Sequence, residues 1–395
     1  MEFCSGGDVE SLLRKYSILS IESTRSYLFQ MFFAVYTCRE QLALRHFDIK
    51  LLNFFITNGS SLLPSHERNM VNHNSKSFSY KRQSKKDILL QIDFGDMQFL
   101  LPINSTSLDL VKLSDFGTSF IGTETLNDPI TIQQFTTIEN TPPEYFILGS
   151  VARQAYSADT FCLGLSMLHL MTGDEPYEEL LKDIVCPKYL ANNLLSIWCK
   201  ANQSIDNPYY IIDELVKSLD VSDDPDEVYP ESSTQAQEQP IDLQYLSHSG
   251  AVLFNTLYRY LVLFGNRPNF FTECPWKSNV IWIAICEALE IDVQQTLISK
   301  KKKKLRPADV LARSKTSAIF QNDLKLWSIH SGSHQVMQRL LYFTLLYFVY
   351  LYLYLYLYLI LFSFRARSNL DQLGEGAWVL FDKMTHFDPA MRFHF

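Results

Sequence analysis

The sequence predicts an α+β fold in which helices predominate. Apolar residues make up 47% of the 395 residues and charged residues 20%, a balance typical of a globular chain with ample core material. Between residues 23 and 44, large apolar side chains recur at spacings of three and four, the period of a helix with one buried face. The apolar run at 108–111 has the length of a strand instead.

Further helices are expected along the chain. The first begins within residues 9–14, and the second, 23–44, leads directly into a loop rich in charged and polar groups. Two more segments, 251–264 and 277–291, are also expected to be helical. Helices therefore flank a small amount of strand.

The loop after the second helix holds the side chains that point to a function. Asp48 lies two positions after His46, and Lys50 lies two positions further on. Asn53 lies five positions after Asp48. Phosphoryl transfer needs these groups, because its transition state carries spread negative charge. A carboxylate orients the acceptor hydroxyl, a cation meets the migrating phosphoryl group, and oxygen ligands hold Mg²⁺.

This spacing resembles H-R-D-x-K-x-x-N, the catalytic loop of eukaryotic-type serine/threonine protein kinases. The resemblance implies that Asp48 is the catalytic base, that Lys50 contacts the γ-phosphate, and that Asn53 is a metal ligand. Phe47 stands where the family has arginine, and Leu51 stands where it has proline. Since that arginine commonly binds a phosphate on the activation segment, its loss argues against activation by phosphorylation.

Further motifs follow in the order of the kinase family. Asp115 begins a D-F-G sequence after the expected strand, and the resemblance makes it a second Mg²⁺ ligand. Glu144 stands at the end of an A-P-E-like motif and is expected to form a buried ion pair with Arg392. Asp159 is expected to accept backbone hydrogen bonds from the catalytic loop. The later motifs lie at residues 141–144, 156–177 and 387–392.

A second D-F-G sequence begins at Asp93. We prefer Asp115, because it leaves 29 positions to Glu144 and because residues 111–113 before it are expected to form a strand.

The segment between these motifs, 118–140, is rich in threonine. Thr137 is expected near the catalytic aspartate. Candidates for phosphorylation, which ordinary turn and strand chemistry explains equally well, are Thr123, Thr125, Thr136 and Thr137.

The first eight residues resemble the kinase hinge, where a short strand passes into a glycine turn and then a helix. By the resemblance, ATP is held here: the backbone around Glu2 and Cys4 binds adenine, and Asp8 reaches the ribose. The glycine-rich loop, the strand lysine and the helix glutamate that the family places before the hinge have no counterpart in these residues. The expected fold is therefore a protein-kinase-like C-lobe without its N-lobe.

Long insertions relative to the family are expected at about 58–107, 200–250 and 295–370. Within the last, the 25 residues at 340–364 carry no charge, so their length qualifies as a membrane span, and their core at 350–359 strictly alternates tyrosine with leucine. Tyrosine hydroxyls would need partners in lipid, and a single crossing would separate Glu144 from Arg392. We therefore expect a simple-sequence insertion, with a membrane anchor as the alternative.

The net charge and the cysteines narrow the expected partners and cellular compartment of the protein. A net charge of −8 argues against a nucleic-acid-binding protein. The 7 cysteines are scattered, which favours a reducing, cytoplasmic compartment. A run of lysines at 300–304 leaves a nuclear location open, although a solvated insertion explains it as well.

The sequence thus predicts ATP- and Mg²⁺-dependent phosphoryl transfer to serine or threonine hydroxyls of a protein substrate, provided that an N-lobe exists. The alternative is a non-catalytic pseudokinase or protein-interaction module. The presence of Asp48, Lys50, Asn53 and Asp115 favours the enzyme, while the lack of N-lobe motifs favours the module.

Overall fold

The structure, a computed structural model, confirms an α+β fold in which helices predominate. The strands within its described part form two separate two-stranded sheets. It describes residues 3–17, 19–58, 88–94, 97–103, 109–200, 208–217, 248–267, 269–292, 306–332, 383–386 and 388–392. Outside the described residues lie Glu2 and the segments 220–240, 300–304 and 340–364. No helix within the described ranges has the length and apolar character to cross a membrane.

The first two helices are α1 (Val9–Tyr16) and α2 (Ile21–Leu42), close to where the sequence places them. α2 begins two residues earlier than its apolar period suggests, because the Ser20 hydroxyl accepts the Ser23 N–H at 3.2 Å and caps the helix. It ends at Ala43, whose left-handed conformation stops the helix just before the polar loop.

The sheet that matters for the site joins β1 (Phe54–Asn58) to β4 (Asp109–Leu113) in antiparallel register. The first residue of β1, Phe54, lies opposite the last residue of β4, Leu113. The chain that follows Leu113 therefore emerges beside the chain that precedes Phe54. The other sheet is the antiparallel pair of β2 (Ile88–Phe94) and β3 (Met97–Ile103).

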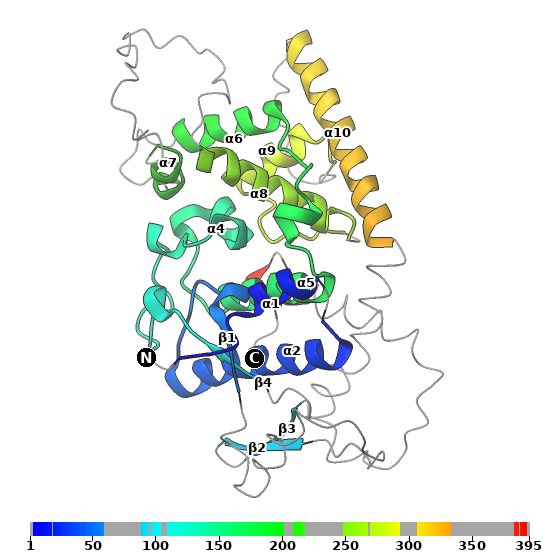
Figure 1. The fold of residues 1–395 in the computed structure, drawn as a ribbon. Helices are drawn as coiled ribbons and strands as arrows, with labels where there is room; N and C mark the ends of the chain where they lie inside the picture. Colours follow the sequence, from blue (N-terminus) through cyan, green and yellow to red (C-terminus); the bar gives the residue numbers. More distant parts are fainter. Residues whose placement is uncertain are drawn as a thin grey trace, which may run out of the picture.

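Helix α5 (Ser157–Thr172) lies between α2 and the layer of α4 and α6–α9 (Figure 1), and its residues belong both to the core shared with α1 and α2 and to the core shared with the remaining helices. Almost every residue of α5 is buried, as expected of a helix that is apolar or small all round. A side chain at Gly164 would come within 2.6 Å of Thr385 and 3.1 Å of Met384. The glycine therefore lets the C-terminal segment pack directly on α5.

Helices α7 and α10 were not expected from the sequence, since both lie in segments interpreted as insertions. Ile211 and Ile212 of α7 are fully buried, and so is Phe320 of α10. Both helices contribute to the same core as α5. The helices on this side are α4 (Pro143–Leu148), α6 (Lys188–Lys200), α7 (Tyr210–Lys217), α8 (His248–Gly265), α9 (Val280–Ala288) and α10 (Pro307–Gly332).

Short helical turns connect these elements and shape the loops around the site. A π-helical turn follows α5 at Pro176–Leu180. The 3-10 turns lie at Leu51–Asn53, Phe116–Thr118, Ile132–Gln134, Ile138–Asn140, Gly149–Val151 and Pro389–Met391.

Candidate active site

The loop at 44–53, between α2 and β1, is anchored by the side chain of Asp159 in the first turn of α5. One carboxylate oxygen of Asp159 accepts the His46 N–H at 2.6 Å, and the other accepts the Phe47 N–H at 2.8 Å. Asp159 is fully enclosed, and these bonds replace the water that burial removes. The expected backbone contact between Asp159 and this loop is confirmed.

Asp48 lies on this loop with both carboxylate oxygens bound by side chains. Oδ1 accepts the hydroxyls of Thr136 at 3.0 Å and Thr137 at 2.9 Å. Oδ2 accepts the Asn53 amide and faces the Lys50 ammonium, each at 3.0 Å. The structure thus brings together Asp48, Lys50 and Asn53, and it confirms the expected proximity of Thr137.

The pKa of Asp48 lies below its usual value. Burial by itself raises the pKa, but the hydrogen bond and positive charge of Lys50 oppose it, and hydrogen bonds from Thr137 and Asn53 lower it further. Asp48 is therefore a carboxylate at neutral pH and can only accept hydrogen bonds.

Lys50 is held between two partners at the edge of the loop. Its Nζ lies 3.0 Å from Asp48 Oδ2 and 3.0 Å from the Thr137 hydroxyl. A quarter of its side chain, 25%, is exposed, so the ammonium remains within reach of an anion that arrives from solvent.

Asn53 and Asp115 lie at the same end of the β1–β4 sheet. Asn53 directly precedes Phe54, and its carbonyl accepts the backbone N–H of Ser114 at 2.9 Å and the Ser114 hydroxyl at 3.1 Å. Asp115 follows Ser114, is exposed, and takes a left-handed conformation with φ of 60°. An amide oxygen and a carboxylate are the hard oxygen donors that Mg²⁺ prefers, so these residues could hold that ion.

Asp93, the start of the second D-F-G sequence, lies elsewhere in the topology. It belongs to β2 and pairs with Gln98 of β3, in the sheet that does not contain β1 and β4. Within the described residues, no group of three or more His, Cys, Asp or Glu side chains is arranged to bind a metal ion.

The N-terminal segment runs along β1. The Gly6 N–H donates to the Ile56 carbonyl at 2.9 Å, and a side chain at Gly6 would come within 2.8 Å of the Ile56 side chain. Asp8 caps α1 by accepting the Ser11 N–H at 2.7 Å. Cys4 is partly buried at the start of this segment. Asp8 also forms an isolated bridge with Phe55, so this segment lies beside the strand that follows the polar loop.

Sequence reasoning missed the structural roles of Arg45 and His46. His46 Nε2 lies 2.8 Å from the Ser114 carbonyl, and its ring contacts Phe116 at 5.3 Å. Arg45 is completely buried. No local sequence pattern indicates that His46 lies against Ser114 or that Arg45 is buried, because the segments that surround these side chains lie far along the chain.

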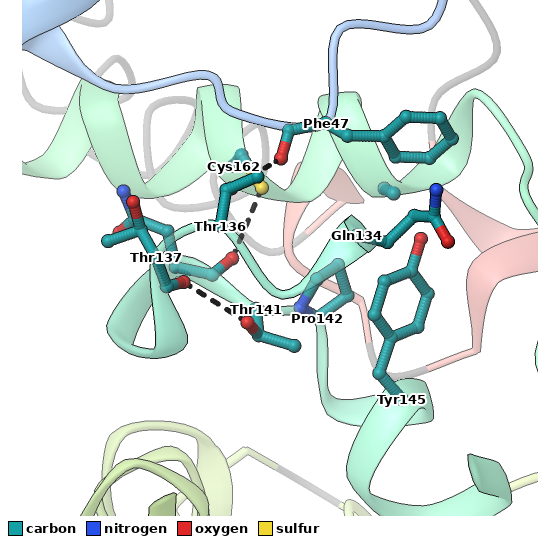
Figure 2. Close-up of a pocket in the computed structure, with 10 residues that line it drawn as sticks. Phe47, Gln134, Thr136, Thr137, Thr141, Pro142, Tyr145 and Cys162 are labelled. Carbon is teal, nitrogen blue, oxygen red and sulfur yellow. Dashed lines mark hydrogen bonds between the residues drawn. The ribbon is translucent and has the colours of Figure 1, made fainter. Parts of the chain in front are cut away.

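Phe47, in place of the expected arginine, belongs to the core. It is 5% exposed and its ring packs edge-on against Phe120 at 5.9 Å. Phe47 also borders a cavity of about 10 Å³, room for a single water molecule, beneath the loop (Figure 2). The Gln134 amide nitrogen and the Tyr145 hydroxyl, both buried, line this cavity without a hydrogen-bond partner in the described structure. They provide the polar partners that a buried water needs.

A scan against protein-family models matched no family, and a search of curated proteins found no significant relative.

Proposed function

We propose that this chain supplies the larger lobe of a serine/threonine protein kinase and, together with a nucleotide-binding small lobe, transfers the γ-phosphoryl group of ATP to a protein hydroxyl. One observation carries the proposal: an ionised carboxylate, Asp48, shares its contacts with a cation, Lys50, and an amide, Asn53, on one anchored loop. Such a set suits phosphoryl transfer, in which positioning and electrostatics dominate catalysis.

Each residue has a distinct role in this proposal. Asp48 accepts the hydrogen bond of the substrate hydroxyl, orients it, and takes its proton as the bond to phosphorus forms. Lys50 offsets the negative charge on the transferred phosphoryl group. Asn53 and Asp115 hold Mg²⁺, which supplies charge neutralisation for the phosphate oxygens.

ATP itself would lie against the segment before α1. The backbone around Glu2 and Cys4 binds adenine in this proposal, and Asp8 bonds the ribose. The pairing of this segment with β1 supports the assignment, because Asp8 bridges to Phe55 and Gly6 bonds Ile56 on the strand that directly follows Asn53.

A second candidate, a non-catalytic interaction module, is favoured by the contacts of Asp48 themselves. The Thr136 hydroxyl lies 3.0 Å from Oδ1 of Asp48 and 3.0 Å from the Phe47 carbonyl, and its contact with Asp48 is the kind that an acceptor hydroxyl would make. A substrate would have to displace or share this contact. In an interaction module, the same hydrogen bonds would simply hold the loop and the 118–140 segment together.

The two candidates are distinguished by an assay of the polypeptide translated from the full transcript. The assay measures transfer of ³²P from ATP to a mixture of serine- and threonine-containing peptides. We expect Asp48→Asn to lower the rate about 10²- to 10⁴-fold, the usual contribution of a positioned general base. Asp128→Asn, at an exposed position outside the loop, is the matched control and should leave the rate unchanged. Wild-type polypeptide that is folded and binds Mg²⁺-ATP but transfers no phosphate would overturn the proposal.

Thr136→Ala adds a second comparison. If the Thr136 hydroxyl competes with substrate for Asp48, its removal should lower the KM for the peptide while kcat is retained. If the loop serves only to hold partners together, Asp48→Asn and Thr136→Ala should alter partner binding and no transferase activity should be present to change.

A further inference from the structure

A pocket of about 270 Å³ lies between α6, α9 and α10. These three helices pack against one another and carry none of the residues assigned to phosphoryl transfer (Figure 1). The volume of the pocket is a little below the roughly 300–1,000 Å³ of typical ligand sites. It therefore suits a small molecule, whose chemistry can be inferred from the side chains that line the pocket.

Short side chains leave this space open between helices that are otherwise well packed. On α6, Leu194 and Trp198 are buried in the core, whereas Ser196 lines the pocket. The Ser196 hydroxyl donates to the Asn193 carbonyl at 2.9 Å, so it is held against its own helix. On α9, the pocket is lined by Ala284, which has only a methyl group. Serine and alanine are too small to fill the gap between the helices, and a preformed pocket results.

Arg313 places a positive charge in the wall of the pocket. It lies three and seven positions before the buried Thr316 and Phe320, on the inward face of α10, where an apolar residue is the usual choice. Its Nε lies 3.7 Å from Oε1 of Glu290, an ion pair too long for a hydrogen bond. The buried Nε–H has no hydrogen-bond partner within the described structure. Since 30% of the side chain is exposed, the guanidinium can still bind an anion from solvent.

A negative charge and an apolar surface complete the lining. Glu287 is exposed on α9, one turn after Ala284. Tyr189 and Ile197 of α6 are half-buried, and both pack against the core while they line the pocket. A simple anion would be repelled by Glu287, and a simple cation would be repelled by Arg313. A molecule that carries both charges and an apolar body is complementary to this lining.

We propose that this pocket binds a free amino acid with an apolar side chain. The carboxylate of the amino acid pairs with Arg313, whose planar guanidinium matches the geometry of a carboxylate. Its ammonium group pairs with Glu287, and its side chain lies against Ile197 and Ala284. This inference goes beyond the proposed function, because the binding requires neither ATP nor Asp48.

Isothermal titration calorimetry of the full chain with L-leucine, L-leucinamide and N-acetyl-L-leucine tests the proposal. Leucinamide lacks the carboxylate and resembles the N-terminus of a peptide, whereas N-acetylleucine lacks the ammonium group and resembles the C-terminus of a peptide. We expect leucine to bind, and each analogue to bind at least about tenfold more weakly, because one charged side chain of the pocket then loses its partner. Absence of leucine binding, or an analogue that binds as tightly as leucine, would overturn the proposal.

Substitutions locate the binding at this pocket. Glu287→Gln, at an exposed position, should weaken leucine binding about tenfold without weakening that of N-acetylleucine, which has no ammonium group. Arg313→Gln should weaken leucine binding and leave that of leucinamide unchanged. Lys315→Gln, exposed on the same helix, is the matched control and should bind leucine as the wild type does. If Arg313→Gln does not fold, Glu287→Gln still decides, because unchanged leucine affinity in that variant would overturn the site.

Discussion

Arg392 and Glu144 form a bidentate ion pair across 248 positions of sequence, with both nitrogen–oxygen distances at 2.6 Å. The side chains are 0% and 4% exposed. Arg392 also donates to the carbonyls of Ser157 at 3.0 Å and His386 at 2.7 Å, so each of its three guanidinium nitrogens donates a hydrogen bond. This pair, expected from the sequence, fastens the C-terminal segment to α4 and to the start of α5.

Removal of one partner of this pair should be costly. We expect Arg392→Met to lower the free energy of unfolding by about 3–5 kcal/mol, because Glu144 would remain buried without its counter-ion. The double variant Glu144→Gln with Arg392→Met should recover part of that loss. Urea denaturation followed by circular dichroism measures both.

The exposed pair of Arg306 and Asp309 provides the control. The side chain of Arg306 is 84% exposed, and Arg306→Met should change stability by less than about 1 kcal/mol. A loss in Arg392→Met that is no larger than in this control would contradict the structural role of the buried pair.

Asp159→Asn should loosen the loop at 44–53. An asparagine side chain has one oxygen where the carboxylate has two, so either the His46 or the Phe47 N–H loses its acceptor and faces an amide NH₂ group. We expect a loss of about 1–3 kcal/mol for the buried, unsatisfied donor. Hydrogen exchange at the backbone amides of His46 and Phe47 should accelerate before that of the α5 core; unchanged exchange there would show that Asp159 does not anchor the loop.

Binding of Mg²⁺-ADP should depend on Asp115 and not on Asp93. Asp115 emerges beside Asn53 at the end of the β1–β4 sheet, whereas Asp93 pairs with Gln98 in the other sheet. Calorimetry of Mg²⁺-ADP with the full polypeptide should show binding weakened in Asp115→Asn and retained in Asp93→Asn. The reverse pattern would transfer the metal-binding role to Asp93.

His169 should make stability depend on pH below neutrality. Burial lowers its pKa to about 4, since the charged form loses water, and Arg14 lowers the pKa further while Glu179 opposes both. The unfolded chain, with a histidine pKa near 6.5, binds more protons between pH 6.5 and 4. The contribution of His169 to stability is therefore fully present above pH 6.5 and is lost as the pH drops toward 4.

The size of this effect is measured against His169→Gln, which does not titrate in that range. Relative to the variant, the wild-type chain should lose about 3 kcal/mol between pH 7 and pH 4, the equivalent of the pKa difference. Parallel stability curves for the two proteins would mean that His169 is protonated as readily in the folded state as in the unfolded chain.

Part of the fold was present in the sequence but was not identified. The buried residues Phe320, Leu324 and Trp327 of α10 lie at i, i+4 and i+7, the spacing of a helix face. α10 was assigned to an insertion because its neighbouring segments have biased compositions. α7 has 8 residues, too few for its period to stand out in a scan along the chain.

By itself, the sequence indicated candidate side chains for chemistry and the approximate positions of the first helices, because capping residues and apolar periodicity act within a few positions. Asp48, Lys50 and Asn53 were predicted from their spacing as one set, and the structure brings them into contact. Only the tertiary structure decided that Thr136 shares Asp48 with Thr137, and that Arg45 meets Thr125 across 80 positions. Such contacts depend on how α5 and the loops pack, and no local pattern of residues encodes the distance between segments that only the folded core brings together.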